Sequence, residues 1–254
     1  SLYLDELNDL INKVTLFGFY FASLDVRQNS KIHESVFTNL ASFPADFEKF
    51  SIAEKLNWLA NLQGKLNPND FADEMTRSTL ESIYAMKTIQ QKNGELGSNR
   101  YIISNCDSAG QVLQAFALIR QCDWENPTVD VVPLFEVIDD LQNAPQIMEQ
   151  LYTCEVYKKH LESRNNIQTV MLGFSDGTKD GGYLMANWSI YKAKENITSI
   201  SRKYGIKVVF FDGRGGPPAR GGGKTHKFYA SLGSSIENQE IQVTVQGQTI
   251  SSNF

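Results

Sequence analysis

Short β-rich runs alternate with helical patterns along the 254-residue chain. The β-rich runs share many β-branched and aromatic residues, and they cover residues 18–27, 100–106, 129–136, 168–176, 206–213 and 241–247. Several are continuously apolar rather than alternating, which is typical of parallel strands covered on both faces. From residue 100 onward strand and helix alternate, so the pattern predicts right-handed βαβ units and a parallel sheet.

Apolar residues at helical spacing mark the segments between these runs. Residues 7–14 and 112–119 each carry an apolar stripe with the period of a helix. The helical segment 144–163 begins with Pro145 near its first turn, where a missing N–H costs nothing. A further helix is expected to end at Gly205, because glycine is the usual residue just beyond a helix.

Residues 31–95 separate the first two runs and show helical patterns, so we expect a helical insertion there. Six strands fit either an open doubly wound sheet or most of a (β/α)8 barrel. No low-complexity linker divides the chain. The expected fold class is therefore α/β with about six parallel strands.

Charged residues cluster where four of the predicted strands end. They are Asp25 and Arg27 at the first strand, Glu136 at the third, Asp176 and Lys179 at the fourth, and Asp212 and Arg214 at the fifth. In parallel α/β folds the active site forms at the carboxyl edge of the sheet, so this pattern predicts a site there. For each residue taken alone, a helix N-cap or a solvated loop charge is the alternative.

The residue types at these strand ends indicate a metal and an anion. Glu136 and Asp176 end successive strands, and neighbouring strands are close enough for both carboxylates to reach one ion. Two carboxylates with water and a substrate oxygen are a usual way to hold Mg²⁺ or Mn²⁺. Arg27 and Arg214 offer a planar fork for phosphate or carboxylate, and Lys179 offers a point charge. A structural pair with a surface aspartate is the alternative for either arginine.

A glycine-rich, basic segment within residues 208–226 follows the fifth run directly. Residues 223–225 read Gly-Lys-Thr, but the first glycine of a nucleotide-binding P-loop would fall on Pro218. The spacing of a dinucleotide-binding loop is also missing. We therefore expect a loop whose N–H groups bind a small anion beside Arg214 and Arg220. A flexible surface loop is the alternative.

Composition narrows the class of partner and the compartment. The formal net charge of −5 favours neither nucleic acid nor an anionic membrane as a partner. Three cysteines without a CxxC spacing disfavour disulfides and zinc, and they fit a reducing cytoplasm. No apolar run approaches the roughly 20 residues of a membrane span. These features predict a cytoplasmic protein that binds a small anion.

Four segments closely resemble signature segments of phosphoenolpyruvate carboxylases, in the order in which that family carries them. They are LDVRQNS at 24–30, PLFEVIDDLQNAP at 133–145, VMLGFSDGTKDGG at 170–182 and FFDGRGGPPARGGGKTH at 210–226. The resemblance implies a partial (β/α)8 barrel of the TIM type. It also implies that residues 1–254 are the central barrel fragment of a longer, divergent bacterial-type enzyme, cytoplasmic and tetrameric.

The implied activity is that of a carbon–carbon lyase. Bicarbonate and phosphoenolpyruvate would give oxaloacetate and phosphate with Mg²⁺ or Mn²⁺, an anaplerotic fixation of carbon. The family's catalytic histidine segment and its mobile arginine loop fall outside this sequence, so the fragment itself is expected to be inactive. Two rivals stay open. One is another metal-dependent barrel lyase, and the other is a catalytically weakened module for anion binding or assembly.

The resemblance also implies roles for individual residues. It matches Glu136 and Asp176 to metal ligands, Arg27 and Arg214 to arginines that hold the substrate phosphate, Lys179 to a lysine at the reacting centre, and Arg220 to an arginine that binds acidic inhibitors. The sequence departs from the family at Asp212, where histidine is usual, and at Gly177, where serine is common. An acid at 212 is expected to weaken the positive field of the site.

Overall fold

An all-parallel, six-stranded sheet organises the computed structural model, which describes residues 3–40, 42–213 and 224–244. Its strands are β1 (Asp25–Asn29), β2 (Arg100–Ser104), β3 (Asp130–Phe135), β4 (Ile167–Leu172), β5 (Lys207–Asp212) and β6 (Ile241–Val243). They lie side by side in sequence order. A doubly wound sheet would reverse its strand order at one point, whereas sequential order is that of a (β/α)8 barrel. The predicted α/β class and partial barrel are therefore confirmed, with a sheet that is not closed.

The sheet curls far enough to bring β2 opposite β6. Arg100 on β2 donates to the side-chain oxygen of Gln242 on β6 at 2.7 Å, although three strands lie between them in the sheet. The Arg100 guanidinium also lies 5.8 Å from the ring centroid of Phe211 on β5. A small apolar cluster fills the concave side of the curl: Ile102, Val132, Leu134, Met171 and Phe211. The concave side is thus the interior of the partial barrel.

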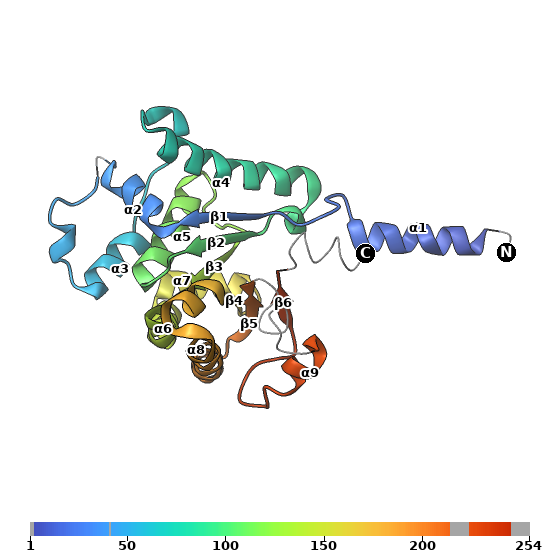
Figure 1. Ribbon diagram of the computed structural model, residues 1–254. Coiled ribbons are helices and arrows are strands. Elements are labelled where there is room, and N and C mark those ends of the chain that lie inside the picture. Colours follow the sequence, from blue (N-terminus) through green and yellow to red (C-terminus); the bar gives the residue numbers. More distant parts are fainter. Residues whose placement is uncertain (1–2, 41, 214–223, 245–254) are drawn as a thin grey trace.

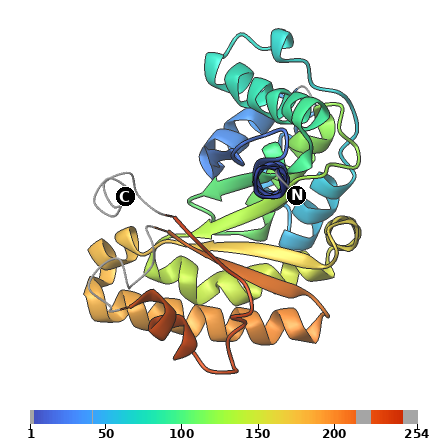
Figure 2. The same cartoon turned by 90° about the vertical axis from the view of Figure 1, so that its right-hand side faces the viewer.

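Helices cover the outer side of the curl. The described helices, of which α1 extends away from the sheet, are α1 (Leu4–Phe17), α2 (Ser30–Thr38), α3 (Ile52–Ala60), α4 (Glu74–Asn93), α5 (Ala109–Gln121), α6 (Ile138–Thr153), α7 (Glu155–Ser163), α8 (Ser175–Lys203, kinked at the non-helical Gly182) and α9 (Thr225–Ala230), with the short 3₁₀ helices η1 (Phe47–Lys49), η2 (Pro68–Asp70) and η3 (Glu95–Gly97). In two perpendicular views the strands lie between α4 at the top and α8 at the bottom (Figures 1 and 2). The main core packs between sheet and helices.

The segment between β1 and β2 holds α2, α3 and α4 and no strand among its described residues. Local signals set where these helices begin. The Ser51 hydroxyl accepts from the Glu54 N–H, and the Glu54 carboxylate accepts from the Ser51 N–H, so α3 begins at Ile52. The Asp73 carboxylate accepts from the Thr76 N–H and begins α4 in the same manner.

Two of the predicted strands are shorter than expected. β1 begins at Asp25 rather than at residue 18, because Gly18 and Phe21 take positive φ angles of 50° and 60° and turn the chain. β4 ends at Leu172 rather than at residue 176. The apolar residues before and after these strands misled the prediction, since turns can also be apolar.

The prediction for Pro145 was wrong. It lies inside α6, which begins seven residues earlier at Ile138. The Asp140 carboxylate accepts from the backbone N–H groups of Glu136 and Val137 at 3.4 and 3.3 Å, and these bonds stabilise the earlier start. The prediction for the end of the next long helix is confirmed, because α8 ends at Lys203 and Gly205 follows with φ 68°.

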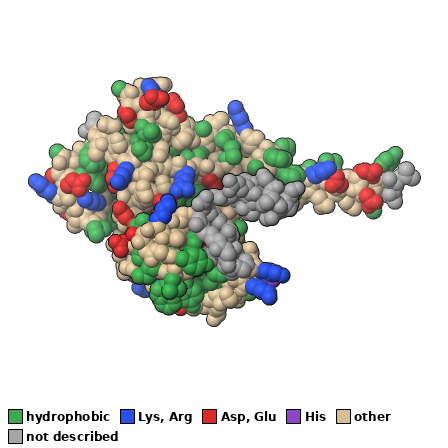
Figure 3. Space-filling model, in the orientation of Figure 1, with side chains coloured by type: hydrophobic (Ala, Val, Ile, Leu, Met, Phe, Trp, Pro, Cys, Tyr) green, Lys and Arg blue, Asp and Glu red, His purple; other side chains and the backbone are tan. Residues whose placement is uncertain are grey.

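Two helices present apolar side chains to solvent. α1 extends away from the rest of the chain and buries none of its residues (Figure 1). Hydrophobic side chains also gather over α8 (Figure 3), where Leu184 and Trp188 are 82% and 59% exposed. Within the described part of the chain, no helix is both long and apolar enough to cross a membrane.

Candidate active site at the carboxyl ends of the strands

An ion pair on the concave side joins the middle of β1 to the end of β3. Arg27 is in register with Ile102, a member of the concave apolar cluster, and Glu136 directly follows β3. The Arg27 guanidinium lies 2.9 Å from Glu136 Oε1, and the backbone N–H of Asn105 donates to Oε2 at 3.1 Å. The Glu136 side chain is 12% exposed and that of Arg27 is 50% exposed. The structure therefore brings these two predicted site residues together at the mouth of the barrel. The prediction that Asp25 and Arg27 end the first strand was wrong, because β1 begins at Asp25 and continues to Asn29. Asp25 instead pairs with Arg100 at 2.9 Å, at the amino ends of β1 and β2.

The predicted adjacency of the third and fourth strands is confirmed, since β3 pairs with β4. Asp176, however, does not end β4. It is the second residue of α8, four residues beyond the strand, and its Oδ1 lies 2.6 Å from Lys179 Nζ on the next turn. Lys179 itself is 77% exposed. Both side chains thus stand at the first turn of a helix rather than on the sheet.

Backbone contacts hold the Glu136 and Asp176 segments side by side. The Gly173 N–H donates to the Phe135 carbonyl at 2.8 Å. A Cβ on Gly173 would lie 3.1 Å from the Glu136 Cα, and one on Gly177 would lie 3.4 Å from the Glu136 carbonyl oxygen. Because both positions are glycine, the chain entering α8 packs directly on the chain leaving β3. The two predicted carboxylates therefore come from touching segments.

Two further aspartates fix this junction. Asp140 lies in the first turn of α6. Burial raises the pKa of Asp140, while its bonds to the Val137 and Glu136 N–H groups oppose that rise. Asp180 lies on α8, and its carboxylate accepts from the Ile138 N–H at 3.1 Å. It thereby ties α8 to the beginning of α6.

The donor chemistry of Glu136 and Asp176 suits Mg²⁺ or Mn²⁺. Both residues offer carboxylate oxygens, and these cations bind oxygen and keep several waters. In residues 3–40, 42–213 and 224–244, no group of three His, Cys, Asp or Glu side chains could hold a metal. A site built from this pair would need water or substrate oxygens to complete it. Arg27 and Lys179 each engage one oxygen of the pair.

The side chain of Asp212 does not face the concave side. It ends β5 as predicted, but its Oδ2 lies 2.7 Å from Lys194 Nζ on α8 and accepts from the Tyr229 hydroxyl on α9 at 2.6 Å. Lys194 therefore pairs with this acid. The expected weakening of the positive field of the site stays a prediction. Arg214 and Arg220 lie outside the described residues.

Sequence reasoning missed Lys194, Asn105 and the capping role of Asp180. A signal for Lys194 was present, because it stands on the same helical stripe as the buried Ile190 and Ile197. A lysine on a buried stripe needs a partner. Nothing in the sequence indicates the N–H donor at Asn105, because that contact depends on the path of the backbone.

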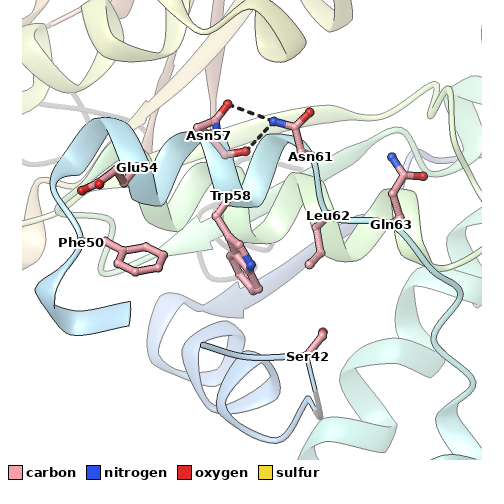
Figure 4. Close-up of a pocket in the computed structure, with 8 residues that line it drawn as sticks. All are labelled: Ser42, Phe50, Glu54, Asn57, Trp58, Asn61, Leu62 and Gln63. Atoms are coloured by element: carbon pink, nitrogen blue, oxygen red, sulfur yellow. Dashed lines mark hydrogen bonds between the residues drawn. The ribbon is translucent and has the colours of Figure 1, made fainter. Parts of the chain in front are cut away.

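A pocket of about 510 Å³ lies along α3 (Figure 4). It is lined by Ser42, Phe50, Glu54, Asn57, Trp58, Asn61, Leu62 and Gln63. The carboxylate of Glu54 is engaged by Ser51, and Asn61 donates to Asn57. Since the lining contains none of the strand-end residues, this pocket is separate from the candidate active site.

Known proteins match the chain along its whole length. A sequence model of the phosphoenolpyruvate carboxylase family matches residues 1–254. Proteins named phosphoenolpyruvate carboxylase from Nitrosomonas eutropha and Gloeobacter violaceus are 35% and 33% identical over 263 and 261 residues. The protein of that name from Corynebacterium glutamicum is 35% identical over 267 residues. These matches cover 98% of this chain but only 28–29% of each relative. The chain belongs to the phosphoenolpyruvate carboxylase family.

Proposed function

We propose that the whole protein containing this chain carboxylates phosphoenolpyruvate with bicarbonate to give oxaloacetate and phosphate. The family match over residues 1–254 supports the activity. The observation that carries the site is the Arg27–Glu136 pair at the mouth of the barrel, with the Asp176 segment packed against it. The proposal concerns the whole protein, because this chain spans about 28% of the length of the curated relatives it matches.

We propose that Glu136 and Asp176 hold Mg²⁺ or Mn²⁺. Once bound, the ion would supply positive charge to the oxygens of the substrate. Arg27 and Lys179 pair with these two carboxylates, so each would have to leave its partner to contact the substrate. Arg27 is half exposed, and its planar fork matches a phosphate group. Arg214 is proposed as a second phosphate-binding arginine.

Lys179 and Arg220 complete the proposed assignment. Lys179 is largely exposed on the first turns of α8, so its ammonium can approach the enolate or carboxylate of the substrate. Arg220 is proposed to bind acidic inhibitors. The assembled protein is proposed to be a cytoplasmic tetramer, which light scattering on the full-length protein would test.

The proposed carboxylation needs positive charge around phosphoenolpyruvate, which is a trianion. A bicarbonate oxygen attacks the phosphoryl group, and the bond from phosphorus to the enolate oxygen breaks. The resulting carboxyphosphate splits into CO₂ and phosphate, which keeps the bicarbonate proton. The enolate carbon then attacks CO₂ and forms oxaloacetate. Arg27 neutralises phosphoryl oxygens throughout, and fixed charge placement of this kind is usually the largest catalytic contribution.

Labelled bicarbonate tests this proposal in the full-length protein. The wild type should place the label in oxaloacetate, and Glu136→Gln should lower kcat/KM by about 100-fold or more, because charged ligands at the reacting centre are lost. Lys13→Gln serves as the matched control, since Lys13 forms an exposed ion pair with Asp9 on α1. Unlabelled products, or full activity in Glu136→Gln, would contradict the assignment.

A second candidate is an anion-binding module without turnover. Asp212 favours this candidate, because phosphoenolpyruvate carboxylases usually have histidine at that position. This candidate predicts that phosphoenolpyruvate binds and that no labelled oxaloacetate appears. The same experiment therefore separates the two functions.

A further inference from the structure

A buried ion pair lies directly behind the carboxyl end of β5. Lys194 on α8 and Asp212 at the last position of β5 are 2.7 Å apart, and the Tyr229 hydroxyl donates to the same carboxylate oxygen. Their side chains are 2% and 5% exposed. Every other ion pair of the described residues has a partner that is at least 26% exposed. Burial therefore distinguishes Lys194–Asp212 from the other pairs.

The alternation of side chains along β5 fixes the direction of Asp212. Phe211 belongs to the apolar cluster on the concave side, whereas Phe210 belongs to the core between sheet and helices. Successive residues of a strand point to opposite faces, so Asp212 points with Phe210. Its contacts with Lys194 on α8 and Tyr229 on α9 agree with this direction. The carboxylate is thus directed away from the side that carries Arg27 and Glu136.

Stability alone does not account for this pair. Taking two charges out of water costs about as much as their attraction returns, and apolar residues of similar volume often serve equally well. The surroundings are apolar, since Lys194 Nζ lies 5.5 Å from the Phe210 ring centroid and 5.4 Å from that of Tyr229. A pair kept in such surroundings therefore needs a reason other than stability.

Backbone packing connects Asp212 to the candidate active site. A Cβ on the next residue, Gly213, would lie 3.4 Å from the Leu172 carbonyl oxygen and 4.0 Å from the Gly173 Cα. Gly173 in turn packs on Glu136. An uncompensated carboxylate at 212 would therefore place a buried negative charge two strands away from Glu136, with β4 between them. In a low dielectric such a charge would repel an approaching anion strongly.

We infer that Lys194 is a positioning residue for the anionic substrate. It neutralises Asp212 and, together with Tyr229, holds the carboxylate toward the helices. The end of β5 then presents no net negative charge to the substrate. The identity of the anion, phosphoenolpyruvate, rests on the proposed function.

Neutralising the two partners separately and together tests this role in the full-length protein. Phosphoenolpyruvate binding is measured by calorimetry, and KM and kcat by steady-state turnover. Lys194→Gln should weaken binding and raise KM by about tenfold or more with kcat within about threefold, because its effect is electrostatic. The double variant Lys194→Gln/Asp212→Asn should return both values to within about threefold of the wild type, since it carries no net charge there.

Two further variants complete the design. Asp212→Asn alone should bind phosphoenolpyruvate at least as tightly as the wild type, and it keeps the test decisive if Lys194→Gln does not fold. Lys192→Gln is the matched control, because Lys192 lies on the same helix and pairs with Glu195 nearer the surface. This control should behave as the wild type.

Four outcomes would overturn the inference: wild-type affinity in folded Lys194→Gln, a double variant no better than that single one, weakened binding in Asp212→Asn, or a wild type that does not bind phosphoenolpyruvate. A wild type that makes no oxaloacetate but shows the expected binding pattern would refute the proposed function alone. If the wild type makes oxaloacetate and folded Lys194→Gln binds phosphoenolpyruvate as tightly as the wild type, this inference alone is refuted.

Discussion

Two histidines in the core make the stability of the fold depend on pH. His33 on α2 is fully buried, and its Nε2 lies 2.9 Å from the Tyr101 hydroxyl oxygen. Its Nδ1 has no hydrogen-bond partner among the described residues. His160 on α7 packs on Phe116, with ring centroids 4.5 Å apart. Burial lowers the pKa of each from 6.5 to about 4, and the nearby Arg164 adds to the effect at His160. Both side chains are therefore held neutral in the folded state.

Unfolding at two pH values tests this consequence. The unfolded chain binds protons at these histidines more readily than the folded chain does. The free energy of unfolding is therefore unaffected by them above pH 6.5 and falls as the pH falls toward 4. At pH 5 each histidine should cost about 2 kcal/mol of unfolding free energy. In His33→Gln the difference between pH 7.5 and pH 5, measured with denaturant, should shrink by about that amount. The exposed His226→Gln is the control, and an unchanged difference in His33→Gln would refute the assignment.

At the level of elements, the junction between the β3–α6 and β4–α8 connections sets the position of Glu136. Gly173 follows β4, and its Cα lies so close to β3 that an added Cβ would meet both Glu136 and the Phe135 carbonyl at 3.1–3.3 Å. Contacts of this length are tighter than ordinary packing, so an alanine there would push the two connections apart. Glycine at 173 is therefore required by a close approach of two backbones.

Gly173→Ala should consequently displace Glu136 and impair the proposed chemistry. We expect kcat/KM of the full-length protein to fall by about tenfold to 100-fold, because small misplacements of reacting groups are costly. Gly94→Ala is the control, since a Cβ at Gly94 meets nothing within 4 Å, although its φ of 92° carries backbone strain. Activity in Gly173→Ala equal to that of Gly94→Ala, with both folded, would show that the close approach does not matter.

The sequence predicted elements well where burial dictated the pattern. β3 and β5 were predictable from their continuous apolar runs, because both faces of these strands are covered. The prediction from sequence failed where contacts between distant elements determine the helix bounds. Pro145 lies inside α6 because Asp140 and Asp180 begin that helix earlier, and Asp180 reaches it from α8. Such bonds between elements leave no periodic signal in the chain.

The candidate site was predictable in part for the same reason. Glu136 directly follows β3, as the strand pattern implies, and the Arg27 side chain reaches it from the middle of β1. The direction of Asp212 was not predictable, since it depends on where β5 ends relative to the face of the sheet. Its partner Lys194 lies 18 residues earlier in the chain, on α8.

At the scale of the whole molecule, apolar side chains of two helices lie exposed among the described residues. α1 buries no residue, and Leu184 and Trp188 on α8 are exposed beside a groove of about 350 Å³ that also contacts α9. Exposed apolar surface of this kind is a candidate site of interaction.

The open barrel leads to the last prediction, that residues 1–254 alone do not make oxaloacetate. The sheet has six strands and is not closed, and Arg27 at its mouth is half exposed to water. Charge placement catalyses best where water is excluded, because water screens the fixed charges. In a coupled reduction assay the isolated chain should stay at background while the full-length protein reacts under the same conditions. Turnover by the isolated chain near that of the full-length protein would show that six strands already exclude enough water, and the proposed site would then be complete without its surroundings.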